Sequence, residues 1–184
     1  MNPFRNMKIS FGNYILAKKQ KKLKRRKTVY NLSTAQNIGV LFNVENMQDY
    51  EKIDPFLSFL SEHGNNIFAL AYYPHKGIPS NLRSISAINI FSKEDLNWYQ
   101  KPSGKFIDKF ITKEFDILID LSSESFFPVK YINNLSKACF KVGKTNEVGF
   151  EYDLTLRLNE KHGDNFYLEQ LKHYLSNINN QKGA

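Results

Sequence analysis

Short apolar runs that alternate with amphipathic segments constrain the fold of this 184-residue chain more than any other feature. Residues 38–42 and 67–73 form two such runs without a charged side chain, which is typical of strands that a sheet buries on both faces. Between them, apolar residues recur at three- and four-residue spacing over residues 47–63 and predict a helix. Strands and helices in this alternation predict a parallel sheet with helices packed on it.

The same alternation continues along the chain. Further strands are predicted at residues 87–91, 115–121, 139–142 and 154–158, and further helices at residues 105–113, 128–137 and 165–178. Proline is best tolerated in the first turn of a helix, so Pro55 favours a start of the first helix near Asp54. Ser92 is followed three residues later by an acid, and this capping pattern predicts a helical turn at residues 96–99. We therefore expect an α/β protein with a single doubly wound, Rossmann-like, mostly parallel sheet and helices on both faces. This domain spans residues 37–184, and a basic N-terminal arm or helix at residues 1–36 precedes it.

The N-terminal segment is strongly basic. Residues 18–27 read KKQKKLKRRK, and no Asp or Glu occurs from residue 1 to residue 44. Ten of the 26 Lys and Arg residues lie in this segment, which leaves 26 − 10 = 16 for residues 45–184. All 18 Asp and Glu also lie in residues 45–184, so the net charge of this part is 16 − 18 = −2. Such a charge block is usually a solvated tail, and its best-founded binding function is to neutralise phosphates. The ten side chains that we expect to contact RNA are Lys18, Lys19, Lys21, Lys22, Lys24, Arg25, Arg26, Lys27, Arg5 and Lys8.

The basic segment lacks a broad apolar face on a helical projection. Like charges four residues apart destabilise an isolated helix, so we expect the arm to become ordered on a polyanionic partner. A helix that lies on a membrane surface would need a wider apolar face, and RNA is the better-fitting partner.

A second candidate surface is the aromatic and basic loop that contains Trp98, Tyr99 and Lys101. The two rings are suited to stack on exposed bases or on a partner protein, while the lysine contacts a phosphate. The alternative is that Trp98 anchors the loop to the hydrophobic core, as large aromatic residues often do.

A third candidate is the crevice at the carboxyl ends of the predicted strands, where Asn43, Asp120 and Ser122 are expected to meet. Asp116 and Asp120 share one side of a predicted strand, which raises the alternative of a paired-carboxylate site. Helix capping and loop hydrogen bonds account for the same residue types. The turn after the first strand reads NVENMQ, without the glycines of a dinucleotide-binding or phosphate-binding loop.

Several functional classes lack support in the sequence. The single cysteine, Cys139, excludes an internal disulfide and a cysteine-rich zinc site, and it favours a reducing, cytoplasmic location. The four histidines lack metal-ligand spacing and no catalytic motif occurs, so we predict no metal, no cofactor and no enzymatic activity. The apolar runs are far shorter than the roughly 20 residues of a membrane-spanning helix. The excess of Lys over Arg and the scarcity of serine argue against an organelle transit peptide.

The segments NIGVLFN, FSKEDLNWY, FDILIDLS and KACFKVG resemble a family of uncharacterised proteins of bacteria of the Bacteroidetes type. The resemblance covers residues 37–178, about three quarters of the chain, and it implies a Rossmann-like body without an assigned activity or site residue.

Two functional hypotheses follow from the sequence. The first is an RNA-binding, ribosome-associated protein, either a lineage-specific component or an assembly factor, whose arm contacts rRNA phosphates while the body docks beside ribosomal proteins. It would bind without DNA sequence readout. The second is a Rossmann-like domain that binds a nucleotide or other small molecule, as a transferase remnant would, in the Asn43 and Asp120 crevice. A protein–protein adaptor that uses the Trp98 loop is a third alternative.

Overall fold

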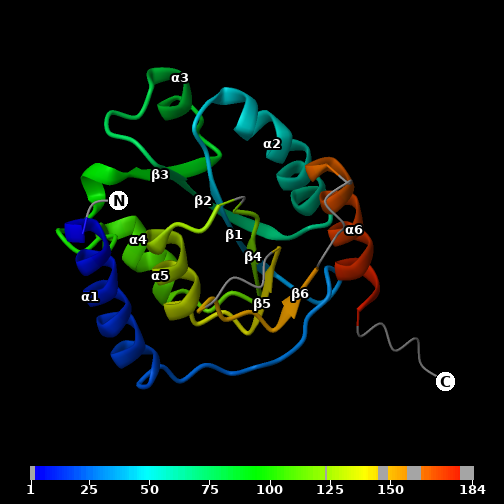
Figure 1. Cartoon of the computed structure of the whole chain (residues 1–184). Helices are drawn as coiled ribbons and strands as arrows, with labels where there is room; N and C mark the ends of the chain where they lie inside the picture. Colours follow the sequence, from blue (N-terminus) through cyan, green and yellow to red (C-terminus); the bar gives the residue numbers. More distant parts are fainter. Residues whose placement is uncertain (1–2, 123, 145–148, 157–162, 179–184) are drawn as a thin grey trace.

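One all-parallel sheet forms the centre of the molecule in the computed structural model (Figure 1). The structure describes residues 3–122, 124–144, 149–156 and 163–178, and within these residues the sheet has six strands. The strand order is β3 (Ile88–Ser92), β2 (Asn66–Tyr73), β1 (Asn37–Asn43), β4 (Ile117–Asp120), β5 (Phe140–Gly143) and β6 (Leu154–Thr155). Each neighbouring pair is parallel. The order reverses between β1 and β4, which is the arrangement of a doubly wound sheet. The predicted α/β fold is therefore confirmed.

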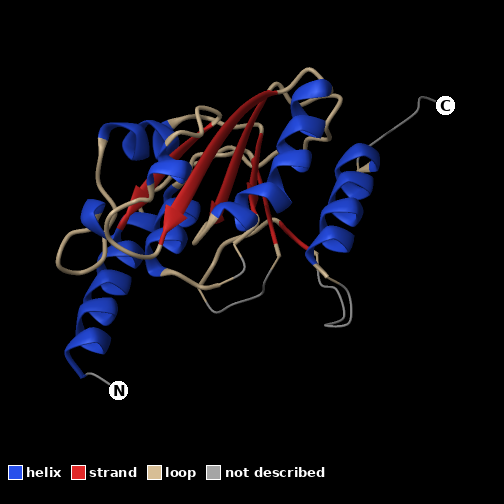
Figure 2. Cartoon of the chain, turned by 90° about the horizontal axis from the view of Figure 1, so that it is seen from above, coloured by secondary structure: helices blue, strands red, loops and turns tan. Residues whose placement is uncertain are grey.

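Helices cover both faces of the sheet (Figure 2). One layer holds α2 (Met47–Glu62), the short α3 (Ser80–Arg83) and α6 (Asp164–Asn177). The other layer holds α4 (Lys105–Thr112) and α5 (Phe127–Leu135), and α1 (Pro3–Gln20) packs outside α5. Consecutive side chains of a strand point to opposite faces, so Val40 and Phe42 lie in the core with α2 and α6, whereas Leu41 lies in the core with α4 and α5.

The hydrophobic periodicity placed the main elements correctly, and two local expectations were wrong. α2 begins at Met47, where Asn46 and Asp49 form a capping box, and Pro55 lies inside the helix rather than in its first turn. Ser92 does cap a helical turn, but that turn is the 3₁₀ helix η1 (Lys93–Asp95) and not residues 96–99. The expected strand at residues 154–158 is shorter in the structure, and Leu158 lies outside the described residues.

Residues 3–36 lie on the body as a helix and a strap instead of extending from it as a free arm (Figure 1). Leu16 of α1 is only 1% exposed and packs against Tyr131 and Leu135 of α5. After Gln20 the chain runs as a strap over residues 21–36 to the start of β1. The buried Leu32 of this strap donates its backbone N–H to the carbonyl of Leu175 in α6 (2.9 Å). The N-terminal segment thus bridges both helical layers.

Candidate functional site

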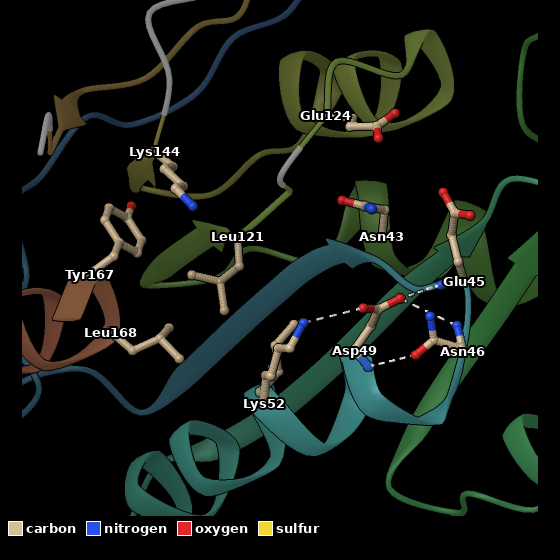
Figure 3. A pocket seen from close by; sticks show the side chains of 11 residues that line it. Asn43, Glu45, Asn46, Asp49, Lys52, Leu121, Glu124, Lys144, Tyr167 and Leu168 are labelled. Carbon is tan, nitrogen blue, oxygen red and sulfur yellow. Dashed lines mark hydrogen bonds and ion pairs between the residues drawn. The ribbon is translucent and has the colours of Figure 1, made fainter. Parts of the chain in front are cut away.

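A cavity of about 280 Å³ opens at the carboxyl ends of β1, β4 and β5, between α2 and α6 (Figure 3). This is the position where the strand order reverses and where doubly wound sheets bind ligands. Lys52 and Lys144 reach toward the cavity from opposite sides, from α2 and from the residue after β5. The remaining residues that line it are Asn43, Glu45, Asn46, Asp49, Ile53, Leu121, Glu124, Tyr167 and Leu168.

The N-terminus of α2 at this cavity is already capped by its own side chains. The Asp49 carboxylate accepts hydrogen bonds from the backbone N–H groups of Glu45 (2.9 Å) and Asn46 (3.3 Å). The Asn46 side chain accepts from the backbone N–H of Asp49 (3.1 Å). A dinucleotide-binding turn offers such N–H groups to a pyrophosphate, and here they face a carboxylate instead. With Glu45 and Glu124 also in the wall, this end of α2 disfavours a phosphate.

Only one of the three residues predicted for the crevice lines the cavity. Asn43 lies in its wall, whereas Asp120 and Ser122 are buried beneath it, 1% and 8% exposed. The Asp120 carboxylate accepts hydrogen bonds from the Tyr152 hydroxyl (2.8 Å) and from the Ser122 backbone N–H (3.0 Å). Asp120 therefore connects the end of β4 to the segment before β6, which is the structural role that the sequence offered as an alternative.

The second carboxylate of the possible pair also has a structural role. Asp116 accepts hydrogen bonds from the backbone N–H groups of Gln36 (2.8 Å) and Asn37 (2.9 Å), so it holds the strap where it enters β1. Asp120 lies at the opposite end of β4. Within the described residues, no group of three or more His, Cys, Asp or Glu side chains is placed to hold a metal ion.

Tyr167 contributes a buried hydroxyl next to the cavity. The residue is 3% exposed, and its hydroxyl has no hydrogen-bond partner among the described residues. Burial, and then the charge of Asp120, raises the pKa of this phenol, so it stays protonated at neutral pH. The Lys144 ammonium lies 5.3 Å from the centre of the Tyr167 ring. The described residues of the cavity wall thus combine acids, lysines and a neutral phenol, and no nucleophile–base pair occurs among them.

The basic run contains one residue that belongs to the fold rather than to a binding surface. The Arg25 guanidinium donates to the carbonyls of Ala138 (2.9 Å) and Cys139 (3.1 Å) and forms an ion pair with Asp153 (2.5 Å). Its side chain is only 7% exposed. Arg25 fixes the strap to the entrance of β5 and to the residue before β6.

Three further cations of the run are partly engaged. The Lys19 ammonium donates to the Tyr131 hydroxyl (2.7 Å), Arg26 donates to the Tyr30 hydroxyl (2.8 Å), and Lys27 lies 3.6 Å from Asp153. The Lys27 side chain is nevertheless 73% exposed, so it remains available to solvent. Together with Arg25, Lys19 and Lys27 hold the two ends of the run against the body.

The other lysines of the run project into solvent. The side chains of Lys18, Lys21, Lys22 and Lys24 are exposed and form no hydrogen bond or ion pair within the part of the chain that the structure describes. Lys8 is exposed on α1, and the side chain of Arg5 lies outside the described residues. These four side chains, which have no acidic partner among the described residues, form an exposed basic surface at the end of α1 and the start of the strap.

Charge is distributed unequally between the two helical layers. Residues 3–36 carry ten cations and no acid, and residues 101–113, which include α4, carry four lysines against one acid, or 4 − 1 = +3. On the opposite layer α2 carries one lysine against four acids, or 1 − 4 = −3, and α6 carries one lysine against two, or 1 − 2 = −1. The α1 and α4 side of the molecule is therefore cationic, and the α2 and α6 side is anionic.

The predicted aromatic loop lies beside α1. Trp98 is 59% exposed, so it does not anchor the loop to the core. Its ring stacks on Phe11 of α1 with a centroid distance of 5.0 Å and an interplanar angle of 29°. Tyr99 is half-buried and meets Phe11 edge-on at 5.4 Å, while Lys101 is half-buried in the same loop. The structure thus brings two predicted surfaces together, the basic segment and the Trp98 loop.

Lys141 is a buried cation that the sequence reasoning did not single out. Its side chain is fully buried, and its ammonium donates to the carbonyls of Asn133 (2.5 Å) and Asn134 (3.3 Å) at the end of α5. Burial, followed by the positive charge of Arg25, lowers the pKa of Lys141 to about 7. The available signal was a lysine in the otherwise apolar strand FKVG, at a position that alternates with Phe140 and Val142.

The chain belongs to DUF6913, a family of unknown function, whose model matches residues 8–178. The matched range includes most of α1 and the whole strap together with the α/β body. No curated protein matches the chain. In the described part of the molecule, no helix is both long enough and apolar enough to cross a membrane.

Proposed function

We propose that this protein binds RNA through the cationic side formed by α1, the strap and α4. The observation that carries this proposal is the group of exposed lysines Lys18, Lys21, Lys22 and Lys24, which have no acidic partner among the described residues. Phosphate neutralisation releases counterions from RNA, and this release supplies much of the affinity of basic surfaces for nucleic acids.

The unequal charge of the two layers also favours this orientation. A polyanion is attracted to the α1 and α4 side and repelled by the acids of α2, so the body docks with α2 and α6 facing away. Arg25 preorganises the exposed lysines for binding because it holds the strap on the body. Less conformational entropy of the chain is therefore lost when these lysines bind RNA.

We further propose that the RNA is ribosomal and that the protein is a ribosome-associated component or assembly factor in the cytoplasm of bacteria of the Bacteroidetes type. An acid-free basic segment on a compact body is suited to contact structured RNA while the body packs on neighbouring ribosomal proteins. Phosphate contacts of this kind position a protein without reading sequence, so affinity is expected to depend weakly on RNA sequence.

The test replaces the four free lysines by glutamine in one variant, at Lys18, Lys21, Lys22 and Lys24. A control removes charge from exposed cations away from this side, at Lys52, Lys76 and Arg83. Deletion of residues 1–36 is unsuitable because Leu16 and Leu32 of this segment are buried in the fold. Binding to ribosomes and to a structured rRNA fragment is measured at several salt concentrations.

We expect the variant with all four lysines replaced, here called the strap variant although Lys18 lies at the end of α1, to bind more weakly, with a log–log salt slope shallower by about 3 to 4. The control is expected to keep the slope of the natural protein. Equal slopes for the strap variant and the natural protein, or binding that salt does not affect, would refute RNA binding by this side of the molecule.

The crevice between α2 and α6 supports a second candidate function, the binding of a small molecule. Its location at the reversal of strand order favours this function, and the capped N-terminus of α2 favours a ligand without a phosphate. A ligand that binds the folded protein raises its melting temperature by mass action. A ligand-induced rise in melting temperature that disappears in Asn43→Ala would support this function. If no cationic or neutral metabolite in the panel raised the melting temperature, this function would be contradicted.

A further inference from the structure

Exposed apolar side chains are concentrated at one place on the cationic side. Met7, Phe11 and Tyr14 follow one another at intervals of four and three residues on α1 and are 63%, 40% and 64% exposed. Trp98 beside them is 59% exposed. These are four of the eight large apolar residues that are exposed in the described part of the molecule. An apolar group of this kind on a soluble surface usually marks a contact site.

The rings of this group are arranged as a platform. Trp98 stacks on Phe11 at 5.0 Å, and Tyr99 packs edge-on against both rings, at 5.4 Å from Phe11 and 5.1 Å from Trp98. Tyr99 is half-buried and supports the other two from the side of the body. Trp98 consequently has a fixed orientation although most of its surface is open to solvent.

The loop that carries Trp98 is held in one conformation. The Asn97 side chain accepts hydrogen bonds from the backbone N–H groups of Tyr99 (3.1 Å) and Lys101 (3.0 Å). Leu96 and Pro102 pair across the base of the loop, and Gln100 adopts a left-handed conformation with φ of 68°. A side chain other than glycine rarely adopts this conformation unless its surroundings hold it there.

The platform continues directly into the basic surface. Lys18 follows Tyr14 by four residues on α1, so these two side chains lie along one side of the helix, and Lys21 and Lys22 follow in the turn directly after it. The rise of 1.5 Å per residue places Lys18 about 6 Å beyond Tyr14 along the helix axis. Aromatic rings beside cations are the pattern by which proteins bind single-stranded nucleic acid, with bases on the rings and phosphates on the cations.

We propose that Trp98, Phe11 and Tyr14 form a stacking platform for unpaired nucleobases of the bound RNA. This inference rests on the proposed RNA binding and adds that the preferred RNA contains a single-stranded segment next to the phosphates that the lysines contact. Every base has an aromatic face, so the platform tolerates any sequence.

Trp98 is the only tryptophan of the chain, and its fluorescence reports directly on this platform. The full-length protein is titrated with a single-stranded uridine oligonucleotide of about 12 nucleotides, a length within the range that single-strand-binding domains cover. A duplex RNA of the same length is titrated for comparison. Quenching of the Trp98 emission by the single strand, with weak or no quenching by the duplex, is the expected result. Affinity is measured in parallel by anisotropy of a label on the RNA.

Two variants and one control accompany the titration. Trp98→Ala and Tyr14→Ala are each expected to weaken single-strand binding by about 5- to 100-fold, the range found when a base-stacking aromatic residue is removed. Tyr174→Ala removes an aromatic residue of similar exposure (48%) from α6 on the anionic side and is expected to change nothing.

The outcomes separate this inference from the proposed function. RNA binding that depends on the lysines but leaves the Trp98 emission and the affinity of Trp98→Ala unchanged would overturn the platform and leave the RNA-binding function standing. If the natural protein bound no RNA at all, both the platform and the RNA-binding function would be refuted. A blue shift of the Trp98 emission with anionic phospholipid vesicles, and none with RNA, would show a membrane surface in place of a nucleobase platform.

Discussion

The guanidinium of Arg25 forms an ion pair with Asp153 at 2.5 Å and donates to two backbone carbonyls at the start of β5, so a residue of the basic run joins sequence positions 128 residues apart. Burial alone would raise the pKa of Asp153. The hydrogen bonds from Arg25 and from the Lys141 backbone N–H, together with the charges of Arg25 and Lys27, outweigh burial and lower it. The pair therefore stabilises the strap above the ordinary pKa of Asp153, and this stabilisation is lost as the pH falls through the lowered value.

Arg25→Gln is expected to destabilise the protein by about 2–3 kcal/mol, because it leaves a half-buried carboxylate and two carbonyls without their cation. Lys24→Gln, at the exposed neighbouring position, is expected to change the free energy of unfolding by less than about 0.5 kcal/mol. Urea unfolding at neutral pH measures both. Equal stability of the two variants would contradict the structural role of Arg25.

The buried Lys141 predicts a pH dependence of stability. Its pKa is about 7 in the folded protein against 10.5 for an unperturbed lysine, so the unfolded chain binds more protons between these values and stability rises with pH there. Lys141→Met is expected to remove this dependence, which amounts to at most about 1.4 kcal/mol per pH unit. The measurement is the free energy of unfolding at several pH values, with Lys137→Met, at a partly exposed position two residues after α5, as the control. Parallel curves for the natural protein and Lys141→Met would contradict the lowered pKa.

Gly12 permits the close approach of α1 to the body. A Cβ atom at this position would lie 2.8 Å from the backbone carbonyl of Tyr99 and 2.7 Å from the ring of Phe127. Alanine is the better helix former by about 1 kcal/mol, but we expect the steric conflict to prevail and Gly12→Ala to destabilise the protein by about 1–2 kcal/mol. Ser10→Ala, at an exposed site of the same helix, is expected to stabilise it slightly. Thermal unfolding compares the two, and stabilisation by Gly12→Ala would show that α1 is not held at this distance.

Pro55 interrupts the hydrogen-bond ladder of α2. It is exposed within the helix and has no N–H to donate to the carbonyl four residues earlier. Pro55→Ala is therefore expected to stabilise the protein by about 1–3 kcal/mol, reduced by the greater freedom that alanine gives to the unfolded chain. Replacement of the exposed Ser58 by alanine in the same helix is the control, with an expected gain of only a few tenths of a kcal/mol. A loss of stability in Pro55→Ala would show that the backbone conformation set by the proline is required for the packing of Phe56 and Leu60.

The α/β architecture was predictable from the amino-acid sequence because strand and helix periodicities are local properties. The apolar run at β1 and the spacing of Phe56 and Leu60 in α2 identify these elements without knowledge of their partners. Helix boundaries such as the start of α2 were less predictable, since the side-chain cap formed by Asn46 and Asp49 outweighed the signal of Pro55.

Which basic and polar side chains remain available for binding depends on the three-dimensional fold and was not predictable from the sequence. The ten cations of the N-terminal segment look equivalent in the sequence, yet the side chain of Arg25 is buried by contacts with residues more than 100 positions away, whereas Lys24 beside it is exposed. The buried Asp120 similarly accepts a hydrogen bond from the distant Tyr152, and the exposed Trp98 stacks on Phe11 of α1. Burial and pairing of a side chain depend on residues that are distant in the chain, and the local periodicity of a sequence carries no information about such contacts.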